Sequence, residues 1–329
     1  MKDAELEVAH RAFAIAPEIA AKYGVLPDVH PEDFIFRFII THPRRPILEH
    51  AVDYYFGDGE RSARRLRLVL QEVCGWRGES IELLEFASGY GCVSRHLRKV
   101  LPEIDVTSSD IHPAAMDFIT GKLGLPTVLS SSVPEQLNTP PNYDVVFALS
   151  FFSHLPKKSW GRWLRVLSSK LKPGGSLIFT THGLVSRDRF GNPELDSDGF
   201  WFDARSEQKD LDTSEYGVAC TAPLFVFREA SADCDGRIIH LREGYWWEHQ
   251  DLYVLKRNPV REGDSQELQQ LAGSSGLLNT VEALSIQLDE LRRRARDLEE
   301  WLHRIHAHPL YKLYRLGKRM IGRRGDSRD

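Results

Sequence analysis

The sequence predicts an α/β protein built on a mostly parallel sheet of seven strands, with helices on both faces. Residues 76–258 alternate short apolar runs with helical patterns, as in proteins with crossover helices. A glycine-rich turn joins the first of these runs directly to a helix. The run at 143–149 is almost continuously apolar, which is typical of a strand buried on both faces. We therefore expect five parallel strands followed by a hairpin-like pair.

Residues 1–75 are expected to form an N-terminal helical cap. Helical patterns cover 9–21 and 62–73, and Ser62 is a plausible N-cap for the second helix. The glycine-containing segment 54–59 is expected to lie between helices. Residues 30–33 are polar and are expected to form a solvated turn.

The elements of the middle segment, 76–258, follow from its apolar runs and its breakers. The expected strands are 81–86, 104–108, 127–129, 143–149, 176–181, 237–241 and 251–256. The expected helices are 93–101, 114–123, 157–171 and one near 223–230. Pro173-Gly-Gly175 is expected to stop the third helix, and a tight connection containing Gly244-Tyr-Trp-Trp247 to join the last two strands.

A different organisation follows the sheet. Residues 259–276 are polar and are expected to be a linker, and 277–308 are predicted to form a coiled coil. Apolar residues recur there with alternating spacings of four and three, at 277, 281, 284, 288, 291, 295, 298, 302 and 305. This pattern predicts a homodimer through 277–305. The alternative is one amphipathic helix packed on its own domain.

The last segment, 309–329, is a basic amphipathic tail. Residues 310–329 carry seven basic and two acidic groups, a net charge of +5. The other 309 residues carry 36 basic and 45 acidic groups, a net charge of −9. Residues 309–324 could therefore touch an anionic membrane surface from the cytoplasmic side. A solvated tail or nonspecific nucleic-acid contact is the alternative. The acidic body argues against a specific nucleic-acid partner.

Composition narrows the class of protein further. Hydrophobic residues make up 42% and charged residues 27%, as in soluble globular proteins. The chain has no run of 18 apolar residues, and its acidic start is unlike a secretory signal. The four cysteines form no C-x-x-C pair, so we expect a reduced, cytoplasmic protein with no disulfide and no metal site.

The glycine-rich turn is the most informative motif. A buried strand ends at Glu85, small residues follow at Ala87, Gly89 and Gly91, and a helix begins at once. A ligand can lie against such a backbone and meet the free N–H groups of the helix. Asp110 ends the second strand, where its carboxylate can accept hydrogen bonds from ribose hydroxyls.

Two other interpretations of this turn remain open. It could be a plain strand-to-helix connection, or it could bind a nicotinamide dinucleotide. The dinucleotide fingerprint is G-x-G-x-x-G, and this chain has Gly89-Tyr-Gly-Cys-Val-Ser94.

The sequence here resembles the class I S-adenosylmethionine-dependent methyltransferases, which have a Rossmann-like fold. The resemblance rests on Glu85-Phe-Ala-Ser-Gly-Tyr-Gly91, on Asp110, and on the segments 143–150 and 171–180, in the family's order. It covers 76–258. Ala87 stands where the family usually has its first glycine, which is tolerable unless the backbone needs a positive φ.

The resemblance implies S-adenosylmethionine as cofactor and gives each motif a role. Glu85 would face the methionine amino end, and Asp110 would hold the ribose. The turn would line the cofactor through Ala87, Ser88, Gly89 and Gly91, and the residues near adenine would be Ser131, Ser132 and Val133. Leu149 and Ser150 would flank the cofactor on the side of the acceptor. Tyr55 would cap the site from the N-terminal segment.

Two histidines are candidates for a general base, because His154 and His182 follow the fourth and fifth strands at the ligand-binding edge of the sheet. Each could instead pack and hydrogen-bond a loop. The fourth strand does not end in the Asn/Asp-Pro-Pro-aromatic motif of enzymes that methylate DNA-base amines. We therefore expect methylation of an oxygen on a small molecule or glycan.

Aromatic residues of the late insertions could wall the acceptor or belong to the core: Trp201, Phe202, Trp246 and Trp247. A second hypothesis is a degenerate, non-catalytic fold that serves as a coiled-coil scaffold.

Overall fold

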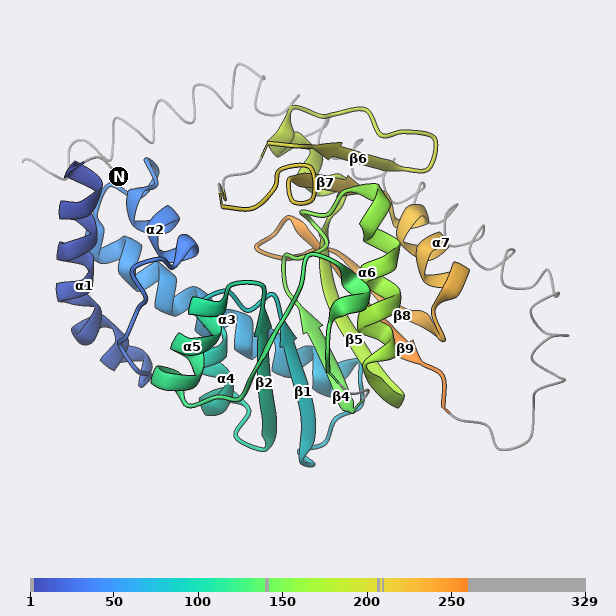
Figure 1. The fold of residues 1–329 in the computed structure, drawn as a ribbon, viewed down its shortest axis with the longest axis horizontal. Helices are drawn as coiled ribbons and strands as arrows, with labels where there is room; N and C mark the ends of the chain where they lie inside the picture. The colour runs from blue at the N-terminus through green and yellow to red at the C-terminus, as the bar shows by residue number, and fades with distance from the viewer. Residues whose placement is uncertain (1–2, 140–141, 206–207, 209, 260–329) are drawn as a thin grey trace, which may run out of the picture. The chain divides into compact units, whose positions relative to one another are not determined.

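A seven-stranded sheet with the order β3-β2-β1-β4-β5-β9-β8 forms the centre of the molecule (Figure 1). The first five strands are parallel, and β9 runs antiparallel to both of its neighbours. The predicted α/β fold class is confirmed. The computed structural model describes residues 3–139, 142–205, 208 and 210–259. The predicted coiled coil and basic tail lie outside the described residues, as does nearly all of the linker.

The main strands lie close to their predicted positions. They are β1 (Ile81–Phe86), β2 (Ile104–Asp110), β3 (Thr127–Leu129), β4 (Tyr143–Ala148), β5 (Leu171–His182), β8 (Gly236–Trp246) and β9 (Gln250–Arg257). A separate antiparallel pair, β6 (Phe200–Asp203) and β7 (Val218–Thr221), was not predicted. It lies above the main sheet in Figure 1.

Helices cover both faces of the sheet. They are α1 (Asp3–Tyr23), α2 (Phe34–Thr41), α3 (Leu48–Glu72), α4 (Ser94–Val100), α5 (Pro113–Phe118), α6 (Lys157–Ser169) and α7 (Pro223–Asp233). Three short helical segments are Ile119–Leu123, Pro134–Gln136 and Leu184–Phe190. Alternate strand residues face opposite sides: Leu83 packs with α3, α4 and α5, and Leu84 packs with α6 and α7.

The N-terminal cap differs from its prediction in helix α3. Helix α3 runs without a break through Gly57 and Gly59, so the expected gap at 54–59 and the N-cap at Ser62 are wrong. Ser62 is buried in mid-helix, and its hydroxyl accepts a hydrogen bond from Trp246 Nε1 at 3.1 Å. The packing of α3 on the sheet therefore overrides the local helix-breaking signals.

The Pro-Gly-Gly segment also differs from its prediction. Helix α6 ends at Ser169, before Pro173 and the two glycines, and 173–175 lie within β5. Leu171 already pairs with Tyr143, and the register shifts before Val145 pairs with Ser176. The segment is a bulge in a strand, with Gly174 at φ +76°.

The last hairpin is longer than expected. β8 continues through Trp246, so most of the glycine-aromatic segment belongs to the strand and not to the connection. The reversal uses Trp247 and Glu248, both at positive φ. Similarly, the predicted helix 114–123 is α5 followed by a π-helical turn that ends at Gly124 in the left-handed region.

Gly59 lets α3 approach the segment that follows the glycine-rich turn. A Cβ on Gly59 would lie 2.2 Å from the backbone oxygen of Cys92 and 2.7 Å from His96 Cδ2. The first of these atoms is backbone and cannot rotate away. The position of α3 against the turn and α4 therefore depends on the absence of a side chain at Gly59.

We predict that Gly59→Ala lowers the free energy of unfolding by about 1–3 kcal/mol, because the core must shift to admit a methyl group. Gly121→Ala is the matched control, since nothing lies within 4 Å of its added Cβ. It should be neutral or stabilising by up to about 1 kcal/mol through helix propensity. Urea unfolding measures both, and equal effects would contradict this account of Gly59.

Candidate functional site

A cavity of about 440 Å³ opens where the parallel strands end. Its floor comes from the residues that follow β1, β2, β3 and β4, at the edge where open α/β sheets bind ligands. The N-terminal segment around Glu32 and the described residues of the segment 208–216, which are 208 and 210–216, form further walls. The volume lies in the range of small-molecule sites.

Most residues of the glycine-rich turn line this cavity. Ala87 has φ +58°, so its backbone does adopt the left-handed conformation that favours glycine, at a cost of about 1–2 kcal/mol. Gly89 has φ +54°, and a Cβ there would meet open space. Gly91 is not part of the lining: a Cβ there would lie 2.6 Å from Leu123 Cδ1. Gly91 thus serves close packing behind the turn.

Glu85 lies buried beneath the turn. Its Oε2 accepts hydrogen bonds from the hydroxyls of Ser94 at 2.5 Å and Ser108 at 3.1 Å. Burial raises the pKa of Glu85 to about 7, against the opposing effect of the two hydroxyls. The carboxyl joins the end of β1 to the start of α4 and to β2.

Asp110 fastens the turn to the end of β2. Its Oδ2 accepts from the backbone N–H of Gly89 at 2.8 Å, and Oδ1 accepts from the backbone N–H and Nδ1 of His112 at 3.1 and 2.7 Å. A carboxylate offers about four acceptor positions. About one therefore remains for a further donor.

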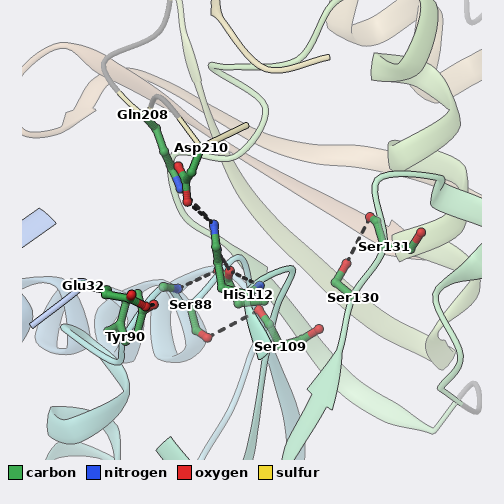
Figure 2. Close-up of polar contacts among 11 residues, drawn as sticks. Glu32, Ser88, Tyr90, Ser109, His112, Ser130, Ser131, Gln208 and Asp210 are labelled. Carbon is green, nitrogen blue, oxygen red and sulfur yellow. Dashed lines mark hydrogen bonds and ion pairs between the residues drawn. The ribbon is translucent and has the colours of Figure 1, made fainter. Parts of the chain in front are cut away.

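His112 bridges two carboxylates. Figure 2 shows its ring reaching from the end of β2 toward Gln208 and Asp210. Nε2 lies 2.8 Å from Asp210 Oδ2, so both ring nitrogens face carboxylate oxygens, an arrangement that favours the doubly protonated, charged ring. The hydrogen bond to Asp110 raises the pKa of His112 above its usual value. The charged ring ties the segment 208–216 to the floor of the cavity.

The N-terminal segment reaches the cavity through residues 32–35. Asp33 is buried and caps α2, and it accepts a 2.6 Å hydrogen bond from Tyr55 Oη. The expected solvated turn at 30–33 is therefore wrong at Asp33. Tyr55 is fully buried behind Asp33 and does not line the cavity. On the other side, Tyr90 of the turn donates to Glu32 at 3.3 Å and stacks on His30.

Arg95 holds this segment against the turn. The buried guanidinium donates from Nε to Gly91 O at 3.0 Å and from Nη1 to the carbonyls of Leu26 and Asp28 at 3.0 and 2.8 Å. Nη2 lies 3.4 Å from Tyr55 Oη. One side chain thus connects the cap and the turn, although the sequence offered no signal for it.

His154 lines the cavity after β4, and His182 lies behind it. His154 Nδ1 donates to the carbonyl of Gly217 at 2.7 Å, which leaves the lone pair on Nε2. Burial lowers the pKa of His154, so the ring is neutral at pH 7. Tyr216 stacks on it with ring centroids 4.7 Å apart.

His182 is not part of the cavity wall. Its Nε2 accepts from the side-chain amide of Gln250 at 3.2 Å. The same amide nitrogen donates to Ser150 Oγ, and Thr180 Oγ1 joins the other end of Gln250 to the Ser150 backbone. This buried network holds Ser150 in its positive-φ conformation at the end of β4.

The remaining candidates divide between cavity, core and surface. Ser131, Ser132, Leu149 and Ser150 line the cavity, whereas Val133 is exposed outside it. Trp247 lines the cavity, and its Nε1 donates to Asp58 of α3 at 2.9 Å. Trp246 belongs to the core, and Trp201 and Phe202 line a separate shallow depression.

Carboxylates dominate the charge of the cavity wall. Of the described lining residues, eight are acidic and none is lysine or arginine. The eight are Glu32, Asp33, Asp58, Glu85, Asp110, Asp210, Asp212 and Glu215.

Two other kinds of site are absent from the described part of the chain. It contains no group of three His, Cys, Asp or Glu side chains placed to hold a metal ion. None of its helices is both long and apolar enough to cross a membrane.

Residues 84–177, from β1 into β5, match the family model of a methyltransferase domain. A search of curated proteins finds no relative by sequence. Similar solved structures include an S-adenosylmethionine-dependent methyltransferase from Methanosarcina mazei, 15% identical with a TM-score of 0.44, over 56% of this chain and 96% of that one.

Two further similar structures are also 15% identical. They are the N-methyltransferase NodS from Bradyrhizobium japonicum (TM-score 0.41, 61% of this chain and 88% of that one) and an O-methyltransferase family protein from Burkholderia thailandensis (TM-score 0.45, 78% and 71%). Likenesses this distant carry no argument about the acceptor of this chain.

We predict that Arg95→Met loosens the cap, because the carbonyls of Gly91, Leu26 and Asp28 lose a charged donor. The free energy of unfolding should fall by at least about 2 kcal/mol. Hydrogen exchange at the amides of Asp33 and Phe36 should accelerate by at least about tenfold. Arg98→Met, on the same helix, is the control, since Arg98 reaches only Leu123 and Gly124. Unchanged exchange in Arg95→Met would show that the cap is held by other contacts.

We predict that ionisation of the buried Glu85 carboxyl destabilises the fold in a pH-dependent way. In the unfolded chain its carboxyl ionises near pH 4.5, whereas in the fold burial delays ionisation to about pH 7. The contribution of Glu85 to the free energy of unfolding should therefore fall as the pH rises from 4.5 to 7, and it should then level off. Glu85→Gln should gain up to about 3 kcal/mol over wild type at pH 8, and little at pH 4.5.

Urea unfolding at both pH values measures this difference, with the exposed Glu103→Gln as control. A variant that is less stable than wild type at pH 8 would show that the ionised carboxylate stabilises the fold.

Proposed function

We propose that this chain, an S-adenosylmethionine-dependent methyltransferase with the class I fold, transfers its methyl group to an oxygen of a small molecule or glycan. The observation that carries the proposal is His154, a neutral histidine on the cavity wall after β4. Its Nδ1 is occupied by Gly217 and its Nε2 is left as an acceptor. A hydroxyl acceptor needs such a base. In the scaffold hypothesis His154 would only hold the loop at Gly217.

The cavity suits S-adenosylmethionine in shape and charge. Above Gly89 the space that a side chain would fill is open, and the acidic wall favours a ligand with sulfonium and ammonium groups. We infer that the turn 87–89 lines the cofactor and that Glu85 faces its amino end. Asp110 has one acceptor position for a ribose hydroxyl, and Ser131 and Ser132 lie toward adenine.

When bound, S-adenosylmethionine supplies an electrophilic methyl carbon. The chain would align the acceptor hydroxyl beside Leu149 and Ser150, and His154 Nε2 would take its proton as the oxygen gains the methyl group. The buried network of Gln250 and His182 would hold Ser150 in place. Tyr216, stacked on His154, would fix the ring plane.

We predict that His154→Ala lowers kcat by about 10²–10⁴-fold and changes S-adenosylmethionine affinity by less than threefold. Because burial lowers the pKa of His154, the wild-type rate should hold as pH falls to 6.5 and decline only below it. Transfer of a labelled methyl group, followed by mass spectrometry, gives the rates.

His182→Gln is the matched comparison, since His182 lies behind the wall. It should lose less than about tenfold. Turnover of His154→Ala within threefold of wild type would exclude a general base at this position, and a larger loss in His182→Gln would move the base there.

We further propose that the chain forms a homodimer through 277–305 and acts in the cytoplasm, with 309–324 touching an anionic membrane surface. The heptad spacing supports the first claim, and the +5 charge of 310–329 supports the second. Sedimentation with anionic vesicles at low salt tests the membrane claim; a protein that stays in solution contradicts it.

With Val281 taken as position a of the first heptad, Leu291 falls at a d position. We predict that Leu291→Asp converts the dimer to a monomer at tens of micromolar. A buried carboxylate in the seam would have no partner. Arg293→Asp, at an outward f position, should leave the dimer intact. Light scattering separates the two states, and a monomeric wild-type protein would contradict the coiled coil.

A further inference from the structure

The acidic wall surrounds the cavity and does not form a single cluster. Glu32 comes from the N-terminal segment, Asp58 from α3, Asp110 from the end of β2, and Asp210, Asp212 and Glu215 from the segment before β7. A ligand in the cavity therefore meets carboxylates from several directions.

The basic side chains that pair with these carboxylates lie outside the cavity lining. Arg61 pairs with Asp58, Lys158 pairs with Glu215, and Arg95 lies behind Asp33. None of these three lines the cavity. His112 is the one charged ring on the wall among the described residues, and Asp110 and Asp210 share it. The side chains that a ligand would touch thus remain net negative.

The cost to an anion is large on this geometry. Like charges repel several times more strongly at the effective dielectric of a protein surface than in bulk water. A phosphate carries up to about two negative charges and meets several carboxylates with no lysine or arginine to receive it. The cofactor adds about one positive charge, which does not reverse the sign of the wall.

One wall residue also suits a cation directly. Trp247 lines the cavity with its indole N–H donated to Asp58, so an aromatic ring and a carboxylate lie together. Positive groups bind favourably against such a pair.

We propose that the cavity accepts methyl acceptors that are neutral or positively charged, such as hydroxylated amines and amino sugars. The negative potential of the wall carboxylates also excludes acceptors that carry a phosphate or carboxylate. This proposal rests on the proposed function, since it assumes that the acceptor enters this cavity.

The first experiment measures the field without any acceptor. Fluorescence of the full-length protein is quenched with caesium, iodide and acrylamide at constant ionic strength, each normalised to free N-acetyltryptophanamide. Subtracting the fluorescence of Trp247→Phe from that of wild type at each quencher concentration gives the quenching of Trp247 alone. Caesium should quench it at least about threefold more strongly than iodide. Equal or stronger quenching by iodide would overturn the proposal.

Asp58→Asn keeps an acceptor for the indole N–H and removes one charge, so it tests the same field with Trp247 in place. Iodide quenching should rise relative to caesium quenching in this variant. An unchanged ratio would mean that the wall carboxylates do not set the field.

The second experiment uses matched acceptors: tyramine, tyrosol and 4-hydroxyphenylacetate, and glucosamine, methyl glucoside and glucuronate. Labelled methyl transfer should favour the cationic and neutral members by at least about tenfold over the acids. Acids turned over within threefold of the neutral members would overturn the charge selection. If no member is methylated while the caesium preference holds, the proposed oxygen acceptor fails for these compounds, and the negative field of the cavity stands.

Discussion

The Glu85 carboxyl is the interaction on which the site depends. It lies where β1 ends, and its hydrogen bonds to Ser94 and Ser108 join the strand to α4 and to β2. The turn must therefore pass directly above it, with Ala87 and Gly89 in positive-φ conformations. Asp110 then receives the Gly89 N–H and fixes the height of the turn over the sheet.

The rest of the cavity is attached to this centre by charged side chains. Arg95 connects the turn to the N-terminal segment, and His112 connects Asp110 to Asp210. At the centre itself burial opposes a charge, as the raised pKa of Glu85 records. Such an arrangement is common at binding sites, where a ligand of opposite charge offsets the cost.

The sheet was predictable because its signals are local. β1 and β3 were placed to the residue, since apolar runs bounded by breakers identify strands with little help from distant contacts. The turn and its acid were predictable for the same reason. The edge of a parallel sheet brings the ends of its strands together whatever the loops do.

What the sequence could not reveal depends on contacts between distant segments. Gly59 looks like a helix breaker until Cys92 O is seen 2.2 Å from its absent Cβ. Asp33 looks solvated until Tyr55 and Arg95 are placed around it. The acidic wall could not be foreseen either, because its carboxylates come from residues 32 to 215 and share no motif.

The central claim is that S-adenosylmethionine lies on the turn above Glu85 and beside Asp110. Titration calorimetry with S-adenosylmethionine on wild type, Asp110→Asn and the control Asp117→Asn tests it most directly. We expect wild type and the control to bind alike, and Asp110→Asn to bind at least about tenfold more weakly, as the loss of a hydrogen bond to a charged group requires. Affinity within twofold of wild type in Asp110→Asn would contradict the claim.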